Sequence, residues 1–115
     1  MAVKWIEYKG KKILYVDFRK LFEEQVTANL NLEIKFIKES PTKVLILANV
    51  EGAAISSLEK IKDVSKKEIS PKVVKSAIVG ITGLKEILLR AYNSFTGSTA
   101  HPFATEQEAM DWLVK

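Results

Sequence analysis

The sequence SAIVGITGLKEILLRAYNSF, from Ser76 to Phe95, decides the fold class of this chain. It begins with an uninterrupted apolar run at 77–79, which is typical of a strand covered on both faces. A turn with two glycines follows, and Thr82 in that turn is suited to cap a helix. The apolar residues after the turn recur at the spacing of one helical stripe, namely Leu84, Ile87, Leu88, Ala91, Tyr92 and Phe95. A strand, a glycine turn and an amphipathic helix in succession predict a layered α/β domain.

The glycine turn is also a candidate ligand site, because unpaired N–H groups at a helix N-terminus attract anions. A phosphate or carboxylate would be held by Gly80, Thr82, Gly83 and Lys85. A tight turn that needs glycine for its backbone dihedrals explains the same residues without any ligand, and it is the commoner case. The glycine patterns of dinucleotide-binding and P-loop proteins are absent from the chain.

Composition narrows the class of protein. A length of 115 residues with 47% hydrophobic and 28% charged residues predicts one globular domain over residues 1–115. No apolar run is long enough to span a bilayer and no secretory signal is evident, so we expect a cytoplasmic protein. Cysteine is absent, which excludes disulfides and thiolate chemistry. The net charge of +4 is modest and acids interrupt the lysine clusters, so we expect no nucleic-acid partner.

The remaining periodicities complete a predicted element order of ββαβαβαβα, a mixed and mostly parallel sheet with helices on both faces. Pro102 marks the last strand as an edge strand, because proline cannot donate to a central ladder. The predicted strands are Lys4 to Tyr8, Lys12 to Phe18, Lys43 to Val50, Lys75 to Ile81 and His101 to Phe103. The predicted helices are Arg19 to Glu39, Ser56 to Glu68, Leu84 to Phe95 and a last one capped by Thr105.

Two periods compete within Arg19 to Glu39. A helical stripe runs through Phe22, Val26, Leu30, Ile34 and Ile37, whereas Leu30, Leu32, Ile34 and Phe36 alternate as in a strand. Acidic residues near the start and lysines near the end suit the dipole of a helix. We therefore predict a helix, and its second half is the less certain part of that choice.

Several segments together resemble the SpoIIAA-like family, a relative of the STAS domains of sulfate transporters and anti-sigma-factor antagonists. They are ILYVDF (Ile13 to Phe18), KVLILANV (Lys43 to Val50), KSAIVGITGLKEILLRAYNSFTG (Lys75 to Gly97) and FATEQEAMDWL (Phe103 to Leu113). The resemblance spans nearly the whole chain. It implies a mixed sheet flanked by helices, and a protein-interaction or regulatory role without catalysis.

The resemblance also directs attention to the loop after the central strand. In the anti-sigma-factor antagonists an Asp-Ser-Ser-Gly-type motif there places a phosphorylatable serine at a helix N-terminus. The matching stretch here contains Asn49, Glu51, Gly52, Ser56 and Ser57, so the Asp is replaced and the serines come later. Ser56 and Ser57 are candidate phosphorylation sites. A serine that only caps the next helix is the alternative.

Catalytic and metal-binding constellations are not evident in the sequence. His101 is the single histidine, and no spaced group of acids accompanies it, so we expect a surface histidine and no metal site or cofactor. Asp17 is the one acid whose position suggests a perturbed pKa, although it would equally serve to cap the following helix. The aromatic side chains, Trp5 among them, are expected in the core or half-buried.

Three functions remain in descending order. The first is a non-enzymatic module that binds another protein through Asn49 to Ser57 and the glycine turn, both at the carboxyl ends of predicted parallel strands. The second is a domain that holds a small anionic or lipid ligand at that same edge. The third is a hydrolase or transferase that uses Asp17, His101 or Ser56. A homodimer through the first strand is compatible with the sequence, although Lys4 and Lys9 also suit protection of that edge.

Overall fold

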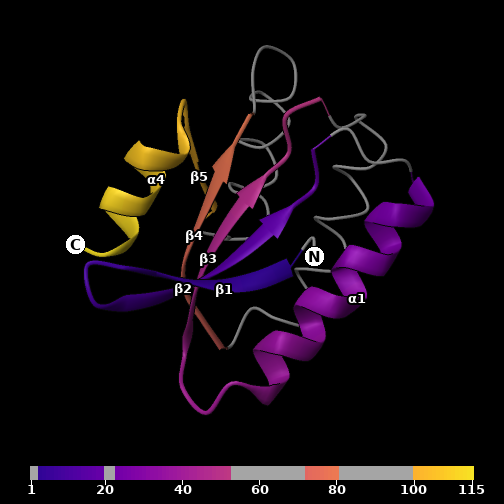
Figure 1. The fold of residues 1–115 in the computed structure, drawn as a ribbon, viewed down its shortest axis with the longest axis horizontal. Helices are drawn as coiled ribbons and strands as arrows, with labels where there is room; N and C mark the ends of the chain where they lie inside the picture. Colours follow the sequence, from indigo (N-terminus) through magenta and orange to yellow (C-terminus); the bar gives the residue numbers. More distant parts are fainter. Residues whose placement is uncertain (1–2, 20–22, 53–71, 81–99) are drawn as a thin grey trace.

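The structure is a computed structural model that describes residues 3–19, 23–52, 72–80 and 100–115. These residues form one five-stranded sheet with helices packed against it (Figure 1). The strands are β1 (Val3–Tyr8), β2 (Lys11–Asp17), β3 (Val44–Asn49), β4 (Val73–Val79) and β5 (Ala100–Phe103). The helices are α1 (Glu23–Glu39) and α4 (Glu106–Leu113).

The sheet is mixed and mostly parallel, as predicted. Its strands lie in the order β1-β2-β3-β4-β5, and only β1 and β2 are antiparallel to each other. β5 is an edge strand, which agrees with the placement of Pro102. The predicted helices at 56–68 and 84–95 lie outside the described residues, so the full element order stays a prediction.

The hairpin that joins β1 to β2 is tighter than the sequence suggested. Tyr8 pairs with Lys11, so the turn contains only Lys9 and Gly10. Both residues have positive φ, 50° and 80°, which is the signature of the two-residue turn that matches the twist of a hairpin. Glycine at the second position avoids the cost of a side chain there.

The strand boundaries agree with the predictions to within two residues. The largest difference is in β4, which begins and ends two residues earlier than expected. Its first pair is Val73 with Val44, and the next is Lys75 with Leu45, so Val74 is an extra residue in a bulge. Val74 is 51% exposed, which explains why an apolar residue can occupy this position without entering the core.

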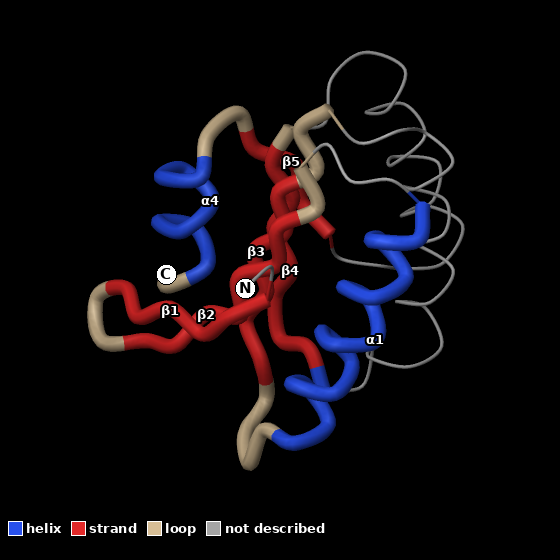
Figure 2. The backbone as a smooth tube through the Cα atoms, turned by 45° about the vertical axis from the view of Figure 1, so that its right-hand side comes forward, coloured by secondary structure: helices blue, strands red, loops and turns tan. Residues whose placement is uncertain are grey.

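Two separate apolar clusters cover the two faces of the sheet. Leu30 and Ile37 of α1 pack against one face, and Ala109 and Leu113 of α4 pack against the other. Figure 2 shows α1 and α4 on opposite sides of the strands. This arrangement confirms the predicted helices on both faces. Within the described ranges, neither helix has the length and apolar character required to cross a bilayer.

α1 confirms the helical choice for the segment with two competing periods, but its buried stripe differs from the predicted one. Leu30 and Ile37 are buried as expected, whereas Ile34 is half-buried and Glu33 takes the central buried place. The apolar residues between them flank the stripe and cover the edge of the same cluster. The side chains of Phe22 and Val26 lie outside the described part of the chain.

Glu33 is the most unusual described residue of α1, because this acid is only 3% exposed. No hydrogen bond or ion pair joins it to another of the described residues. Burial disfavours the charged carboxylate and raises the pKa of Glu33 to about 8. Glu33 is therefore a further described acid with a perturbed pKa besides Asp17, and the apolar periodicity did not reveal it.

The Glu33→Gln variant is expected to remove a pH-dependent loss of stability. An unfolded glutamate titrates near pKa 4.3, so between about pH 4.3 and pH 8 only the unfolded chain releases this proton. The free energy of unfolding should therefore fall by up to ~1.4 kcal/mol per pH unit in that window, and Gln should abolish this component. Urea denaturation from pH 4 to 9 measures it. Glu24→Gln, an exposed change on the same helix, should keep the wild-type slope; equal slopes in all three proteins would contradict the assignment.

Candidate functional site

Three neighbouring parallel strands end side by side and form one rim of the sheet. Asp17 at the end of β2 is in register with Asn49 at the end of β3, and Asn49 is in register with Val79 at the end of β4. Backbone hydrogen bonds continue past the strands, from Phe18 N to the Asn49 oxygen and from Val50 N to the Val79 oxygen, both 2.8 Å. We call this edge the carboxyl rim.

Asn49 is the central residue of the carboxyl rim. Its side chain is only 4% exposed, so each polar atom of the amide needs a partner. Nδ2 donates to Glu106 Oε2 at 2.7 Å, and Oδ1 accepts from the backbone N of Glu51 at 3.1 Å. The first contact ties β3 to α4 across the sheet, and the second closes the turn that follows β3.

Glu106 accepts hydrogen bonds from two side chains at the carboxyl rim. The same Oε2 atom accepts from the Tyr15 hydroxyl at 2.6 Å as well as from Asn49. Glu106 is the first residue of α4, where the helix dipole favours an acid, and Thr105 caps that helix by accepting from Glu108 N at 3.2 Å. The predicted capping residue Thr105 is thus confirmed, and it sets the position of Glu106.

Tyr15 lies within this network on the α4 face of β2. Burial, the hydrogen bond to Glu106 and the negative charge of that carboxylate together hold the pKa of the Tyr15 phenol well above its ordinary value. The phenol is therefore a hydrogen-bond donor over the whole physiological range. Tyr15, Asn49 and Glu106 form a fixed triad, in which both donors bind one oxygen of the carboxylate.

The loops after β3 and β4 touch at the carboxyl rim. Gly80 has φ of +93°, and a Cβ atom placed there would lie 2.5 Å from the backbone N of Glu51 and 2.7 Å from its Cα. Only glycine permits this approach. The two predicted loops therefore meet, and the exposed Glu51–Gly52 turn rests directly on Gly80.

Asp17 ends β2 with a contact to a nearby cation. Its carboxylate accepts from the Arg19 backbone N at 3.0 Å and from the guanidinium at 2.9 and 3.0 Å. The hydrogen bonds to Arg19 hold the pKa of Asp17 below its usual value. Asp17 does not cap a helix, since the next two residues, Phe18 and Arg19, are not helical. Asn29 of α1 instead donates to the backbone oxygen of Asp17 at 2.7 Å and anchors this end of β2.

The structure unites part of the predicted site. Asn49, Glu51, Gly52 and Gly80 meet at the carboxyl rim. The other candidates, Ser56, Ser57, Thr82, Gly83 and Lys85, lie outside the described residues. Tyr15 and Glu106 were missed, because a strand tyrosine and a first-turn glutamate appear structural until the topology brings them to Asn49.

Asp17 and His101, two of the three residues considered for catalysis, lie apart, and the third, Ser56, lies outside the described residues. His101 is exposed on β5 with its ring 4.6 Å from that of Trp112, whereas Asp17 lies on β2. Two strands separate β2 from β5, which corresponds to roughly 14 Å between their backbones. Among residues 3–19, 23–52, 72–80 and 100–115, no group of three acids or histidines is placed to hold a metal ion.

Comparison with solved structures finds this arrangement in a protein of known structure. An uncharacterized protein of the DUF3478 family with a SpoIIAA-like fold, from Shewanella loihica PV-4, superposes with a TM-score of 0.70. The match covers 97% of this chain and 92% of the other, at 20% sequence identity. The fold of this chain is SpoIIAA-like. At this identity the likeness concerns the fold, which the sequence resemblance had led us to expect. No family model and no curated protein matches the chain.

The close approach of the two rim loops in this SpoIIAA-like fold can be tested with a pair of glycine variants. Gly10 and Gly80 both have positive φ, but a Cβ at Gly10 meets no atom within 4 Å. Gly10→Ala should cost about 1 kcal/mol of stability from backbone strain alone. Gly80→Ala should cost at least about 1 kcal/mol more, because it also displaces Glu51. Urea denaturation midpoints measure both, and equal losses would show that the loops do not touch.

The triad at the carboxyl rim has a spectroscopic signature. Glu106→Gln removes the charge beside Tyr15, so the phenol pKa should fall yet stay above the usual value of about 10, since burial is its largest cause. Ultraviolet titration of tyrosinate measures this, with Tyr15→Phe to assign the signal. The exposed change Glu108→Gln on the same helix should leave the titration unaltered.

The raised pKa of Tyr15 also affects stability at alkaline pH. Above about pH 10 the unfolded chain releases the phenol proton and the folded chain keeps it, so the free energy of unfolding falls as the pH rises. Tyr15→Phe lacks this component, so its free energy of unfolding should begin to fall at a higher pH.

Proposed function

We propose that this chain is a non-enzymatic interaction module of the cytoplasm that regulates another protein by binding it through the carboxyl rim. The observation that supports the proposal is the exposed Glu51–Gly52 turn held on a buried frame. Asn49 fixes one side of the turn by its hydrogen bond to Glu51 N, and Gly80 supports the other side. A rigid, exposed turn loses little conformational freedom on binding, which favours recognition.

The chemistry of the rim favours binding over catalysis. Among the described rim residues other than Glu51, the side chains that could act as acid, base or donor are engaged with one another, Glu106 with Tyr15 and Asn49, and Asp17 with Arg19. Their hydrogen bonds serve to hold the frame in one geometry. A general base needs an oxygen or nitrogen within reach of a substrate proton, and these groups are committed to internal partners.

The charge of the described rim indicates the kind of surface that fits it. Asp17, Glu51 and Glu106 are acidic, and Arg19 is the basic residue among them. Glu51 is the exposed acid at the tip, with no ion pair to another described residue. We therefore expect the partner to present a basic patch, with a contribution to the association rate that weakens as salt is added.

Charge reversal at Glu51 provides the test. Affinity-tagged wild type, Glu51→Lys and Glu7→Lys proteins are expressed in the source cells, cross-linked and compared by quantitative mass spectrometry. Glu7 is an exposed acid at the far end of the sheet, so its reversal changes the net charge equally. The partner should be enriched by wild type and Glu7→Lys and reduced roughly tenfold with Glu51→Lys, equivalent to ~1.4 kcal/mol. A protein set that does not depend on Glu51 would refute the proposal.

A further inference from the structure

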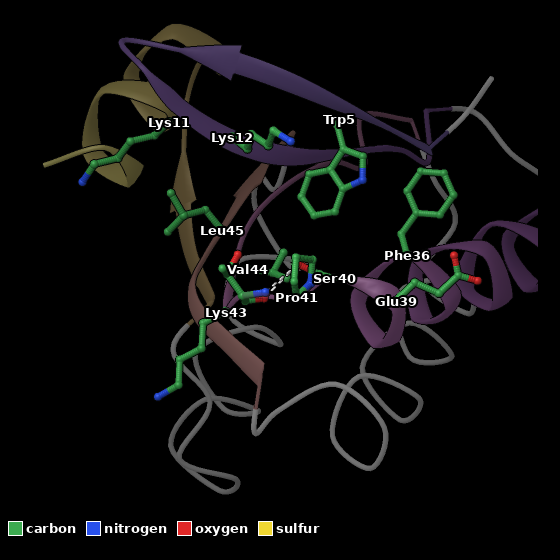
Figure 3. A pocket seen from close by; sticks show the side chains of 11 residues that line it. Trp5, Lys11, Lys12, Phe36, Glu39, Ser40, Pro41, Lys43, Val44 and Leu45 are labelled. Atoms are coloured by element: carbon green, nitrogen blue, oxygen red, sulfur yellow. Dashed lines mark hydrogen bonds between the residues drawn. The ribbon is translucent and has the colours of Figure 1, made fainter.

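A second feature lies at the opposite end of the sheet, where the parallel strands begin. A cavity of about 630 Å³ opens between the β1–β2 hairpin, the end of α1 and the start of β3 (Figure 3). This volume is in the usual range for small-ligand sites, ~300–1,000 Å³. β2 runs seven residues from this end to the carboxyl rim, so roughly 20 Å separates the cavity from the rim.

One wall of the cavity is aromatic. The rings of Trp5 on β1 and Phe36 on α1 have centroids 6.4 Å apart and are inclined by only 16°. Figure 3 shows both rings with their faces toward the viewer, so the two nearly parallel rings form an offset pair that lines the cavity. Trp5 is 39% exposed, which corrects the expectation that it belongs to the core or is half-buried. An exposed aromatic wall of this kind is suited to stacking a planar group.

The floor of the cavity is preorganised. α1 ends at Glu39, and Ser40 N donates to the Ile37 oxygen at 3.2 Å. Ser40 is buried, and its hydroxyl donates to the Thr42 oxygen at 2.8 Å and accepts from Thr42 N at 3.4 Å. Pro41 further restricts the backbone of this turn. A ligand would therefore meet a floor that needs little ordering.

The charge around the cavity is positive. Lys11, Lys12 and Lys43 line it together with a single acid, Glu39. Glu7 is the cross-strand neighbour of Lys12, yet none of the three lysines forms an ion pair with any other residue that the structure describes. Figure 3 shows Lys12 directed toward Trp5, whereas Lys11 and Lys43 extend outward at the mouth. The amine nearest to the aromatic wall is thus available for an anion.

We propose that this cavity binds a small amphipathic anion, with its planar apolar body against Trp5 and Phe36 and its anionic group at Lys12. Lys43 and Lys11 attract the anion to the mouth. The aromatic wall supplies most of the affinity through buried apolar area, and the lysines select the charge. The half-enclosed shape favours a small molecule. The site is independent of the interaction surface proposed at the carboxyl rim, because different residues at opposite ends of β2 form it.

The probe for the test is 2-naphthoate, which combines a fused planar ring with one carboxylate. Binding to the full chain is followed by protein-observed and ligand-observed NMR. A ligand of this size at ~0.3–0.4 kcal/mol per heavy atom should bind with a Kd on the order of 0.1–1 mM. The chemical-shift changes caused by 2-naphthoate should be largest at Trp5, Phe36 and the turn at 40–43. The neutral analogue 2-naphthalenemethanol should bind at least about fivefold more weakly, since it lacks the charge.

Variants of the lining residues complete the test. Trp5→Ala should weaken 2-naphthoate about tenfold or more, and Lys12→Glu about fivefold or more. Lys35→Glu makes the same charge change on the exposed side of α1 outside the lining, and it should bind as wild type does. Circular dichroism checks the fold of each variant. If Trp5→Ala does not fold, the affinity of Trp5→Leu for 2-naphthoate and the map of chemical-shift changes in the wild type test the proposal instead.

Three results would overturn the proposal. The first is equal binding of the anion and its neutral analogue, and the second is a shift map centred on another part of the chain. The third is binding of phosphatidylglycerol vesicles or of a thymidine oligonucleotide through Trp5 and Lys12 without binding of 2-naphthoate. Loss of naphthoate binding leaves the Glu51 experiment unaffected, so the two proposals succeed or fail separately.

Discussion

The burial of β3 on both of its faces is the constraint on which the rest of the structure depends. Ile46 contacts the cluster under α1, and Leu47 contacts the cluster under α4, so the strand must be covered from both sides and paired along both edges. Parallel pairing with β2 and β4 satisfies its backbone groups and brings three strand ends into register. The carboxyl rim depends on this register, because the register places Asn49 at the end of β3, where it binds Glu106.

The two ends of the sheet differ in chemistry. At the carboxyl rim, polar side chains are paired internally and glycine permits two loops to meet, which leaves a rigid turn with an exposed acid. At the opposite end, the space between the hairpin, the end of α1 and the start of β3 is lined by two aromatic rings and by lysines that form no ion pair with the described residues. A small α/β domain can therefore have a rigid, hydrogen-bonded surface at one end of its sheet and an open cavity at the other.

Glu33 shows where local pattern and tertiary burial disagree. Helical periodicity places Leu30 and Ile37 on the buried stripe, and the same geometry carries Glu33 between them. Pattern reasoning assigned the central place to Ile34, because an apolar residue at that spacing is the usual choice. The chain instead accepts a neutral carboxyl in the core and lowers its stability toward alkaline pH.

The sequence alone determined the strands, the two described helices, the edge position of β5 and the cap at Thr105, because these depend on local periodicity, proline chemistry and capping. It also indicated the SpoIIAA-like fold and four residues of the rim. Tertiary structure alone decided that Tyr15 and Glu106 join Asn49, that Gly80 supports Glu51, and that Trp5 faces a cavity beside Phe36. These contacts link residues from 29 to 91 positions apart, and no local pattern shows which distant side chains the strand register and the packing of α1 bring together.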